Sequence, residues 1–563
     1  MIRSLFALFI ATTTSLFATT FSKALPIPAL ASYSVVNGEK VFDMNIHESH
    51  TEFFPGVQTK TYGINSSVLG ETIRIHNGDK VRINYHNNLA QPTTMHGHGM
   101  HVPAIMDGGP INKIQPGTTW SAIYTVDQKA STNWYHPHLM GKTAEHVYMG
   151  LAGLIIVDDN ESDALNLPKR YGVDDIPLIL QDKRFDANGQ IDYSPSLMEI
   201  RRGYTSNMML VNGTITPYVN IEAKRIRFRV LNGSNSRVYH LAFSDGRRFF
   251  QIATDEAFLE HPVSLSSLVL SPGERAEIVV DFTGEIGTDV ILKETADNLD
   301  IMKISVSNAP TTTSTLPSTL TSLEIYSAAE AVNTRTFVLN MSGMGMNGHM
   351  AINGKTMDLN RIDEVVPVNQ VEIWDITNSM GMPHNFHIHA THFYILQRNG
   401  SAANVAANEK GYKDVVYMPP NSSARVIVKM KDFTDSNTGY MYHCHFLEHE
   451  DDGMMGQFTV VQNSSAPVPD LDGDGLDDVT DSDDDGDGVA DSSDAFPRNA
   501  SESLDTDGDG IGNNADSDDD NDGFTDTEER NAGTDTLDPE SHPKRSYIPI
   551  NMEKGLIIFI PFI

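Results

Sequence analysis

The chain is poor in cysteine, in positive charge and in long apolar runs. Its 563 residues include a single cysteine, so no internal disulfide can form. Lysine and arginine number 40 against 75 aspartates and glutamates, and the net charge of −35 argues against nucleic acid and anionic membranes as partners. The apolar stretch from Leu5 to Phe21 is interrupted by threonines, so we expect no transmembrane span.

Residues 1–24 have the pattern of a secretory signal peptide. Arg3 gives a positive start, the apolar stretch follows, and Ser22-Lys23-Ala24 suits cleavage. We therefore expect an exported protein, located in the periplasm or outside the cell. A lone cysteine in an exported chain needs a purpose other than a disulfide, and metal ligation is one such purpose.

The next part of the chain repeats a pattern of alternating strands that end at an asparagine, each followed by a turn that contains proline. The strands are 81–87, 226–232 and 371–378, and the turn prolines are Pro116, Pro272 and Pro419. These prolines lie 156 and 147 residues apart, which is a domain length. Short alternating strands between turns predict an all-β fold of three consecutive Greek-key β-sandwiches. We place the parts of the chain as follows: sandwiches at 34–160, 165–308 and 333–462, a linker at 309–332, an acidic tail at 463–545 and an extension at 546–563.

The lone cysteine lies in the segment His443–Met454. On a strand, His443 and His445 point to one face and Cys444 to the other, so the three can serve two metal sites that share a backbone. A Cys, His and weak axial Met set is what a blue-copper site uses, which makes His449 and Met454 natural partners of Cys444.

Three further motifs carry paired histidines, and each His-x-His pair places two imidazoles on one strand face. The motifs are His96-Gly97-His98, His136-Pro137-His138 and His384-Asn-Phe-His387-Ile-His389. With His443 and His445 there are four His-x-His pairs and so eight paired histidines, enough for three copper ions if the first and third sandwiches face each other. His384 has the opposite parity and is able to turn toward Cys444. The second sandwich has no such pair, so we expect it to act as a spacer.

Over about residues 40–462 the sequence resembles the multicopper oxidase family of the three-cupredoxin-domain type, closest to bacterial laccase-like and copper-efflux oxidases. The four histidine motifs carry the resemblance, together with Met106-Asp-Gly-Gly-Pro110, Trp134-Tyr-His-Pro-His138 and Gly150-Leu-Ala-Gly-Leu-Ile-Ile-Val157. The resemblance implies four copper ions. Its ligands would be His384, Cys444, His449 and Met454 for type 1; His96 and His387 for type 2; and His98, His136, His138, His389, His443 and His445 for the type 3 pair.

The resemblance also implies a reaction in which single electrons from a small reducing substrate pass through Cys444 and O₂ is reduced to water. Asp107 and Glu450 match acids that supply protons in the family, although each could be an ordinary turn acid or a hydrogen-bond partner of a ligand. Gly97 stands where the family usually has Trp, and Met140 where relatives often have a further His. Neither difference removes a ligand.

The electron donor stays open at this point. Met341, Met344, Met346, Met350 and Met357 form a methionine-rich run, and Met380 and Met382 flank His384. Thioethers suit Cu(I), so the run could admit cuprous ions, or it could simply fill the core with flexible side chains. A phenol or aryl amine that docks near His449 is the other candidate donor.

The tail from Asp470 to Glu540 contains 27 acidic and 2 basic residues and repeats one loop form. Oxygen-bearing residues at alternate positions before a tight-turn glycine are what Ca²⁺ loops need. The glycines 475, 488, 510 and 523 step by 13, 22 and 13 residues, which resembles thrombospondin type 3 repeats. The candidate calcium ligands are Asp470, Asp472, Asp474, Asp483, Asp485, Asp487, Asp505, Asp507, Asp509, Asp518, Asp520, Asp522, Asp526 and Glu529. Such a tail could act as a spacer or as a tether to a cell surface or matrix.

The main alternative to an exported copper oxidase is a cupredoxin scaffold for Ca²⁺-dependent surface adhesion or interaction, with incidental or no oxidase activity. The complete set of candidate copper ligands argues against that alternative.

Overall fold

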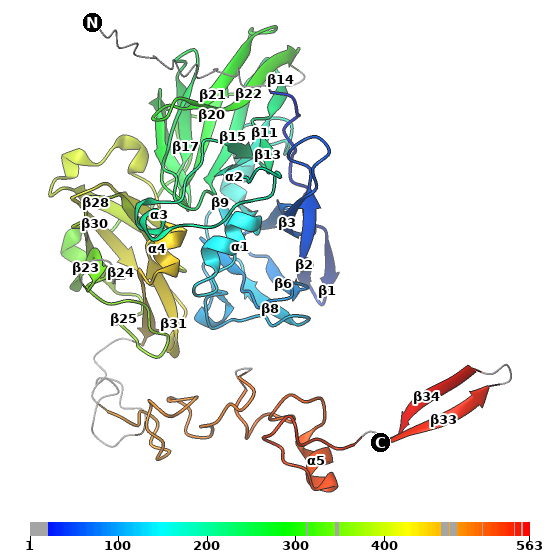
Figure 1. Cartoon of the computed structure of the whole chain (residues 1–563). Coiled ribbons are helices and arrows are strands. Elements are labelled where there is room, and N and C mark those ends of the chain that lie inside the picture. Colours follow the sequence, from blue (N-terminus) through cyan, green and yellow to red (C-terminus); the bar gives the residue numbers. More distant parts are fainter. Residues whose placement is uncertain are drawn as a thin grey trace, which may run out of the picture. The chain divides into compact units, whose positions relative to one another are not determined.

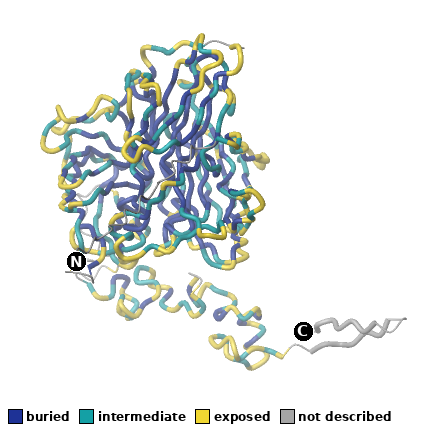
Figure 2. The backbone as a smooth tube through the Cα atoms, turned by 45° about the horizontal axis from the view of Figure 1, so that its top comes forward, coloured by how far each residue is buried: buried dark blue, intermediate teal, exposed yellow. Residues whose placement is uncertain are grey.

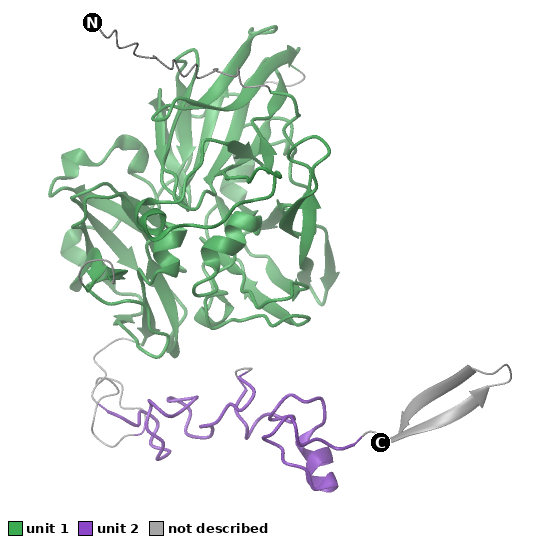
Figure 3. Ribbon diagram, viewed as in Figure 1, with its two compact units in different colours: residues 1–462 green, residues 463–563 purple. Residues whose placement is uncertain are grey.

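The computed structural model describes residues 21–310, 314–343, 348–462, 472, 481–508, 511–544, 546–552 and 556–562, without the side chains of the last two segments. The chain divides into two compact units, residues 1–462 and 463–563, shown separately in Figure 3. Unit 1 is built almost entirely of strands (Figure 1), which confirms the expected all-β class. Among the described residues, no helix has the length and apolar character needed to cross a bilayer.

The first sandwich packs a sheet in the order β4-β3-β2-β6-β8, with β1 paired to β2, against a sheet in the order β5-β10-β9-β7. Its elements are β1 (Tyr33–Val36), β2 (Glu39–Thr51), β3 (Thr59–Ile64), β4 (Leu69–Gly70), β5 (Ile73–His76), β6 (Lys80–Asn87), β7 (His96–His98), η1 (Ala104–Met106), β8 (Thr119–Thr125), β9 (Ser131–His136), α1 (Thr143–Met149), β10 (Gly153–Asp158) and α2 (Asn160–Ala164).

The second sandwich has sheets in the orders β13-β12-β11-β15-β20-β17-β18 and β14-β22-β21-β16-β19. Its elements are β11 (Asp175–Asp182), α3 (Leu197–Arg202), β12 (Met209–Val211), β13 (Thr214–Ile215), β14 (Tyr218–Glu222), β15 (Arg225–Asn232), β16 (Tyr239–Phe243), β17 (Phe249–Ala253), β18 (Phe258–Leu265), β19 (Leu268–Leu270), β20 (Arg275–Asp281), β21 (Asp289–Glu294) and β22 (Leu299–Asn308).

The third sandwich has sheets in the orders β24-β23-β26-β30-β28 and β25-β32-β31-β27-β29. Its elements are η2 (Ala328–Glu330), β23 (Asn333–Ser342), β24 (His349–Ile352), β25 (Glu364–Pro367), β26 (Val371–Asn378), β27 (His384–Ile388), β28 (Phe393–Arg398), η4 (Ala402–Asn404), η5 (Ala407–Glu409), β29 (Val415–Met418), β30 (Ser422–Lys429), β31 (Asp435–His443), α4 (Leu447–Asp451) and β32 (Met455–Val461).

The three sandwiches repeat one topology. Among the described residues, all three share two parallel strand pairs in mostly antiparallel sheets: β2·β6 and β5·β10, then β11·β15 and β14·β22, then β23·β26 and β25·β32. The first sandwich has a further short parallel pair, β3·β4. Alternation along the strands sends apolar side chains between the two sheets, where each sandwich has its own core. In the third core, Trp374 of one sheet lies edge-on to Phe458 of the other, with ring centroids 5.7 Å apart. Figure 2 shows the buried backbone running through all three.

Residues 21–24, the end of the predicted signal peptide, lie against the body. The carbonyl of Lys23 accepts a 2.9 Å hydrogen bond from the amide of Tyr218, and Lys23 Nζ donates to the carbonyl of Glu52 at 2.5 Å. The amide of Leu25 donates to the carbonyl of Tyr218 at 2.7 Å. Cleavage after Ala24 would therefore remove contacts that the folded body makes.

Unit 2 contains irregular acidic loops, one helix, α5 (Asp526–Ala532), and the hairpin β33 (Ser546–Met552) with β34 (Leu556–Phe562). Helix α5 follows the last acidic loop, and among the described residues of 511–525 no helix precedes that loop. A pair of helices around the loop is therefore absent from these residues.

Candidate metal centre

The first sandwich holds two of the paired histidine motifs on neighbouring strands. β7 and β9 pair antiparallel, with His96 directly opposite His136. His98 lies two residues along β7, and His138 follows the end of β9. All four imidazoles are buried. Because side chains alternate along a strand, both pairs present their rings to the same space.

The third sandwich repeats this arrangement with β27 and β31, where His387 lies opposite His443. His389 follows the end of β27 and His445 follows β31, and these rings are buried too. Cys444, between His443 and His445, points into the core of the sandwich instead.

The two sets of histidines meet between the first and third sandwiches. Nε2 of His443 lies 3.1 Å from Nε2 of His138 and 3.1 Å from Nε2 of His389. Nε2 of His445 lies 3.4 Å from Nε2 of His136. The groups whose nitrogens lie within 4.8 Å of one another are His138, His389 and His443; His98, His136 and His445; and His96, His98 and His387.

Hydrogen bonds to carbonyl groups fix the orientation of several rings. Nδ1 of His96, His136 and His387 donates to the carbonyls of Asp107, Pro137 and Asp414 at 2.7, 2.8 and 2.8 Å. A carbonyl oxygen only accepts, so Nδ1 carries the proton and Nε2 keeps a free lone pair that faces the cluster. His98 differs: neither of its nitrogens has a hydrogen-bond partner, and its Nε2 lies 3.3 Å from Oδ2 of Asp414, which leaves Nδ1 as the nitrogen available to a metal.

The cluster suits copper. Burial lowers the pKa of His138 to about 4 and of His445 to about 3, and it lowers the pKa of His96, His98 and His387 well below the ordinary value. These imidazoles are therefore neutral. Nε2 of His96 and His387 and Nδ1 of His98 are buried without a hydrogen-bond partner. Neutral imidazoles with unpaired, convergent lone pairs are ligands that copper prefers.

A second site lies around Cys444. Its Sγ is 3.6 Å from Nδ1 of His384 and 3.6 Å from Nδ1 of His449, and these two nitrogens are 3.0 Å apart. Met454 is fully buried in the same core, and its carbonyl accepts a hydrogen bond from the amide of Cys444. Burial raises the pKa of the Cys444 thiol to about 12, so a thiolate here needs a cation beside it. A thiol and two imidazoles this close to one another fit a blue-copper site.

Both candidate acids touch histidines of the cluster. Oδ2 of Asp107 lies 2.7 Å from Nδ1 of His389, and Oε2 of Glu450 lies 3.2 Å from Nδ1 of His443. Burial raises the pKa of Asp107 well above its usual value. Burial acts in the same direction on Glu450, but His138 and His443 hold its pKa at about 2. The pKa values of two carboxyl groups next to one cluster are thus shifted in opposite directions.

The space beside Gly97 is occupied. A Cβ at this position would lie 3.2 Å from Cγ of Met100 and 3.9 Å from Cδ1 of Ile155. Met100 is itself buried, so its side chain packs next to the position where a side chain at residue 97 would begin.

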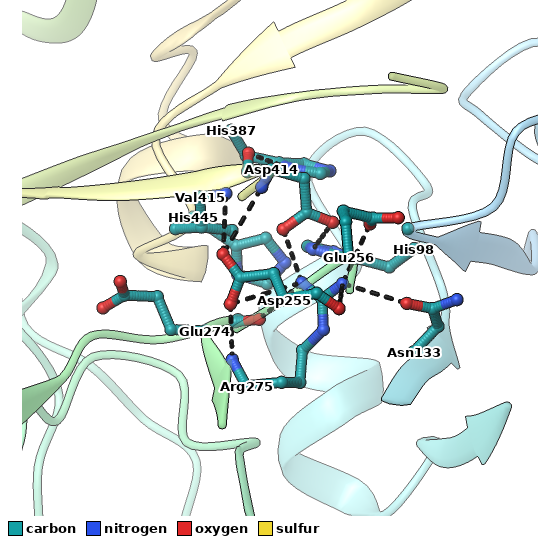
Figure 4. A network of polar contacts seen from close by, with 12 residues as sticks. His98, Asn133, Asp255, Glu256, Glu274, Arg275, His387, Asp414, Val415 and His445 are labelled. Atoms are coloured by element: carbon teal, nitrogen blue, oxygen red, sulfur yellow. Dashed lines mark hydrogen bonds and ion pairs between the residues drawn. The ribbon is translucent and has the colours of Figure 1, made fainter. Parts of the chain in front are cut away.

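Three residues at the site could not be identified from the sequence pattern alone. Asn385 Nδ2 donates to Oγ of Ser271 and to the carbonyl of Pro272, and its Oδ1 accepts from the amide of His445 at 2.6 Å. Asp414 contacts His98, and Arg275 of the second sandwich contacts Asp414 (Figure 4). The second sandwich, expected to be only a spacer, reaches the cluster through them.

Comparison with known proteins agrees with this geometry. Residues 45–162 and 330–464 match two family models described as multicopper oxidase. The chain is 37% identical to a multicopper oxidase of Staphylococcus epidermidis over 429 residues, 75% of this chain and 89% of that protein. It is 34% identical to the cell division protein FtsP of Photorhabdus laumondii over 455 residues, 78% and 92% of the two chains. A laccase structure from Pediococcus acidilactici matches with a TM-score of 0.73 and 35% identity, covering 79% and 95%.

The fold and the two histidine sites define a copper-dependent oxidase built from β-sandwiches. The chain belongs to the multicopper oxidase family, and membership implies copper ions as its resident cofactor.

Proposed function

We propose that the protein is an exported multicopper oxidase that couples one-electron oxidation of a small reducing substrate to the four-electron reduction of O₂ to water. His384, Cys444, His449 and Met454 would hold a type 1 copper, and His96 and His387 a type 2 copper. The groups His98, His136, His445 and His138, His389, His443 would each hold one copper of a type 3 pair. Bound copper supplies the one-electron redox chemistry.

One observation carries this proposal: Cys444 belongs to one site while its two neighbours in the chain belong to the other. Sγ of Cys444 faces His384 and His449, whereas His443 and His445 face the histidines of the first sandwich. The covalent path from Sγ to either imidazole crosses a single peptide unit. Oδ1 of Asn385, 3.7 Å from Sγ and bonded to the amide of His445, stiffens that path.

The chain's own acids are placed to move protons. Burial raises the pKa of Asp107 well above its usual value, and Asp107 lies against His389 on one side of the cluster. Glu450 lies against His443 on the other side and is ionised. We propose that Asp107 donates a proton at the cluster and that Glu450 passes protons between His443 and solvent-facing groups.

The structure constrains how the donor approaches. His384 and His449 are both buried, and Nε2 of His449 donates to the carbonyl of Arg201 at 3.2 Å. Arg201 belongs to α3, whose Leu197 and Met198 are 57% and 51% exposed. We propose that a phenol or aryl amine docks on α3 and that its electron crosses the Arg201 peptide to His449.

A cuprous donor has a different set of supporting contacts. Met341, Met380 and Met382 are partly buried beside the core that contains Cys444. Met350 and Met357 are fully buried packing residues, while Met344 and Met346 lie outside the described residues. Three partly buried thioethers against the core that contains Cys444 support Cu(I) as a second donor class.

Oxygen uptake by the copper-loaded protein, measured in parallel with Cu(I) and with a phenol, tests this function. We expect uptake with at least one donor and none in the Cys444→Ser variant. Copper-loaded protein that takes up no oxygen with either donor would favour the alternative, a scaffold for interaction. We retain that alternative because some relatives are named cell division protein FtsP rather than oxidase.

We also propose that the tail binds Ca²⁺. Segments 483–494 and 518–529 share one pattern: Gly488 and Gly523 donate to Asp483 and Asp518 at 3.1 Å each, and Asp484 and Asp519 donate to Asp491 and Asp526 at 2.9 and 3.1 Å. In the second segment, Glu529 is fully buried and neither of its carboxylate oxygens has a hydrogen-bond partner.

The unpartnered oxygens of this loop support binding of a cation. They are Oδ1 of Asp518, Oδ1 of Asp519, Oδ2 of Asp520, Oδ2 of Asp522 and both oxygens of Glu529. Burial and then the charges of Asp520, Asp522 and Asp518 raise the pKa of Glu529, which places its carboxylate beside those three. A Ca²⁺ ion takes six to eight oxygen ligands and removes this repulsion. Asp470, Asp474 and Asp509 lie outside the described residues, so they stay predictions.

Export is the remaining part of the proposal and is supported by the sequence of residues 1–24. Because Lys23 and Leu25 bond to Tyr218, cleavage before Lys23 would keep all of these contacts. Sequencing the N-terminus of protein recovered from the periplasm or medium tests export and locates the cleavage site.

A further inference from the structure

The second sandwich reaches the histidine cluster through one buried arginine. Arg275, the first residue of β20, is 1% exposed. Its Nη1 donates to Oδ1 of Asp414 at 2.5 Å. Its Nε donates to the carbonyl of Thr132 at 3.0 Å, and Nη2 donates to Oδ1 of Asn133 at 3.1 Å. One guanidinium therefore bonds to the first sandwich, through β9, and to the third, through Asp414 (Figure 4).

Asp414 in turn holds two histidines that come from different sandwiches. Its Oδ2 lies 3.3 Å from Nε2 of His98, and its carbonyl accepts from Nδ1 of His387 at 2.8 Å. The rings of His98 and His387 stack with centroids 3.8 Å apart and planes 7° apart. The side chain and main chain of one residue thus set the orientation of both rings.

Further groups of the second sandwich keep Asp414 in place. Oδ2 of Asp255 accepts from the amide of Asp414 at 3.3 Å and from Nζ of Lys413 at 2.8 Å. Glu256 accepts from Nη2 of Arg275 at 3.0 Å. Both buried cations of this network, Arg275 and Lys413, therefore have acid partners.

We propose that Arg275 and Asp414 are positioning residues for the copper cluster: they hold His98 with Nδ1 facing the metal and lock its spacing to His387. The negative carboxylate 3.3 Å from Nε2 favours the tautomer of His98 with its proton on Nε2, so the lone pair is left on Nδ1. The inference rests on the copper sites proposed above. It gives the second sandwich a part in building a site to which it contributes no ligand among the described residues.

Asp414→Asn is the sharpest variant because it keeps the shape of the side chain. The amide offers one acceptor where the carboxylate offers two. Either its NH₂ group faces the Arg275 guanidinium, donor against donor, or it faces Nε2 of His98. In the second case Nε2 must accept, the proton moves to Nδ1, and His98 ceases to be a ligand.

Arg275→Met removes the guanidinium, and Arg229→Met is its matched control. Arg229 is equally buried and also bridges to the first sandwich, donating to Oγ1 of Thr132 at 2.9 Å, with Asp175 and Glu277 as its acid partners. It has no contact with Asp414. Both methionine variants lose stability, but only the Arg275 change affects the cluster.

The experiment measures bound copper, the blue absorption and the electron paramagnetic resonance signal of the non-blue copper in the full-length protein. For Asp414→Asn and Arg275→Met we expect cluster copper affinity to fall about 10- to 100-fold while the blue absorption stays near the wild-type value. Arg229→Met should keep both signals at lower thermal stability. Arg275→Met that matches Arg229→Met in copper content and spectrum, or Asp414→Asn with wild-type spectra, overturns the inference.

A failure of the proposed function would look different, because the wild-type protein itself would then bind no blue copper. If Arg275→Met does not fold, Asp414→Asn alone decides the question, since that change leaves the volume and the Arg275 charge in place.

Discussion

The histidine cluster of the body and the acidic loop 518–529 of the tail both gather buried atoms that can ligate a metal ion, but they do so in opposite ways. The cluster collects neutral imidazoles from strands as far apart in sequence as His138 and His443, with Nε2 atoms 3.1 Å apart. The loop collects carboxylates within twelve positions of one another, and they repel. Burial and the neighbouring Asp526 raise the pKa of Asp519 to about 6 as a result.

This difference shows what holds the metal-ligating side chains of each site in place. Two sandwich cores hold the imidazoles whether or not an ion is present, because neutral rings in contact do not repel. The carboxylates have little core around them, so the loop depends on the cation for its shape. The first group of experiments removes the ions, and the later ones remove single donors.

Chelation should produce the largest difference between the two regions. Removing Ca²⁺ from the full-length protein is expected to abolish amide protection over 518–529, because the carboxylates then repel. Removing copper should leave the protection of β27 and β31 largely intact. Hydrogen exchange measured by mass spectrometry reports both regions in one sample. If the amides of 518–529 are equally protected from exchange with and without Ca²⁺, the loop does not depend on the cation for its shape.

Cys444→Ser should have the largest effect of any single substitution. We expect the blue colour and turnover to disappear, since the serine hydroxyl is a poor copper ligand, while the fold loses only about 1–3 kcal/mol for burying a hydroxyl. Absorption and oxygen uptake measure the first effect, and thermal unfolding the second. A blue and active serine variant would contradict the role given to Cys444.

Glu529→Gln should weaken Ca²⁺ binding about 10- to 100-fold, because one charge and one strong oxygen ligand are lost from the loop. Calorimetric titration of the full chain measures the affinity. Glu540→Gln, an exposed acid in the same tail, removes the same charge outside the loop and is the control. Identical affinities for the two variants would show that only net acidity matters.

Met454→Leu should have the smallest effect. The buried thioether is the weak axial ligand in the proposed type 1 site, so its loss is expected to raise the reduction potential while turnover changes by less than about tenfold. Redox titration of the blue absorption measures the potential. An unchanged potential would remove Met454 from the ligand set.

The sequence predicted the parts of this molecule that depend on local periodicity. Alternation along strands gave the three sandwiches, and the same alternation explains why His443 and His445 face one way and Cys444 the other. The ligand roles stay predictions, although the structure brings these histidines together. Arg275, Asp414 and Asn385 were missed because their meaning comes from partners more than a hundred residues away, as in the contact of Asn385 with Ser271.

The same limit explains the view of the second sandwich as a spacer. Nothing in the local pattern around Arg275 differs from that of other strand arginines, such as Arg229. Only the packing of β20 against β9 shows that Arg275, and not Arg229, contacts Asp414. Long-range placement of charge is not encoded in periodicity.

The loop from Cys444 to Met454 closes on itself through two main-chain hydrogen bonds, from the amide of Cys444 to the carbonyl of Met454 and from the amide of Met454 to the carbonyl of His449. Three of the four type 1 candidates therefore lie on one short segment that its own hydrogen bonds stabilise, and only His384 comes from another strand. This segment can be transferred as a unit to another sandwich that supplies one histidine, which makes it useful for engineering electron transfer.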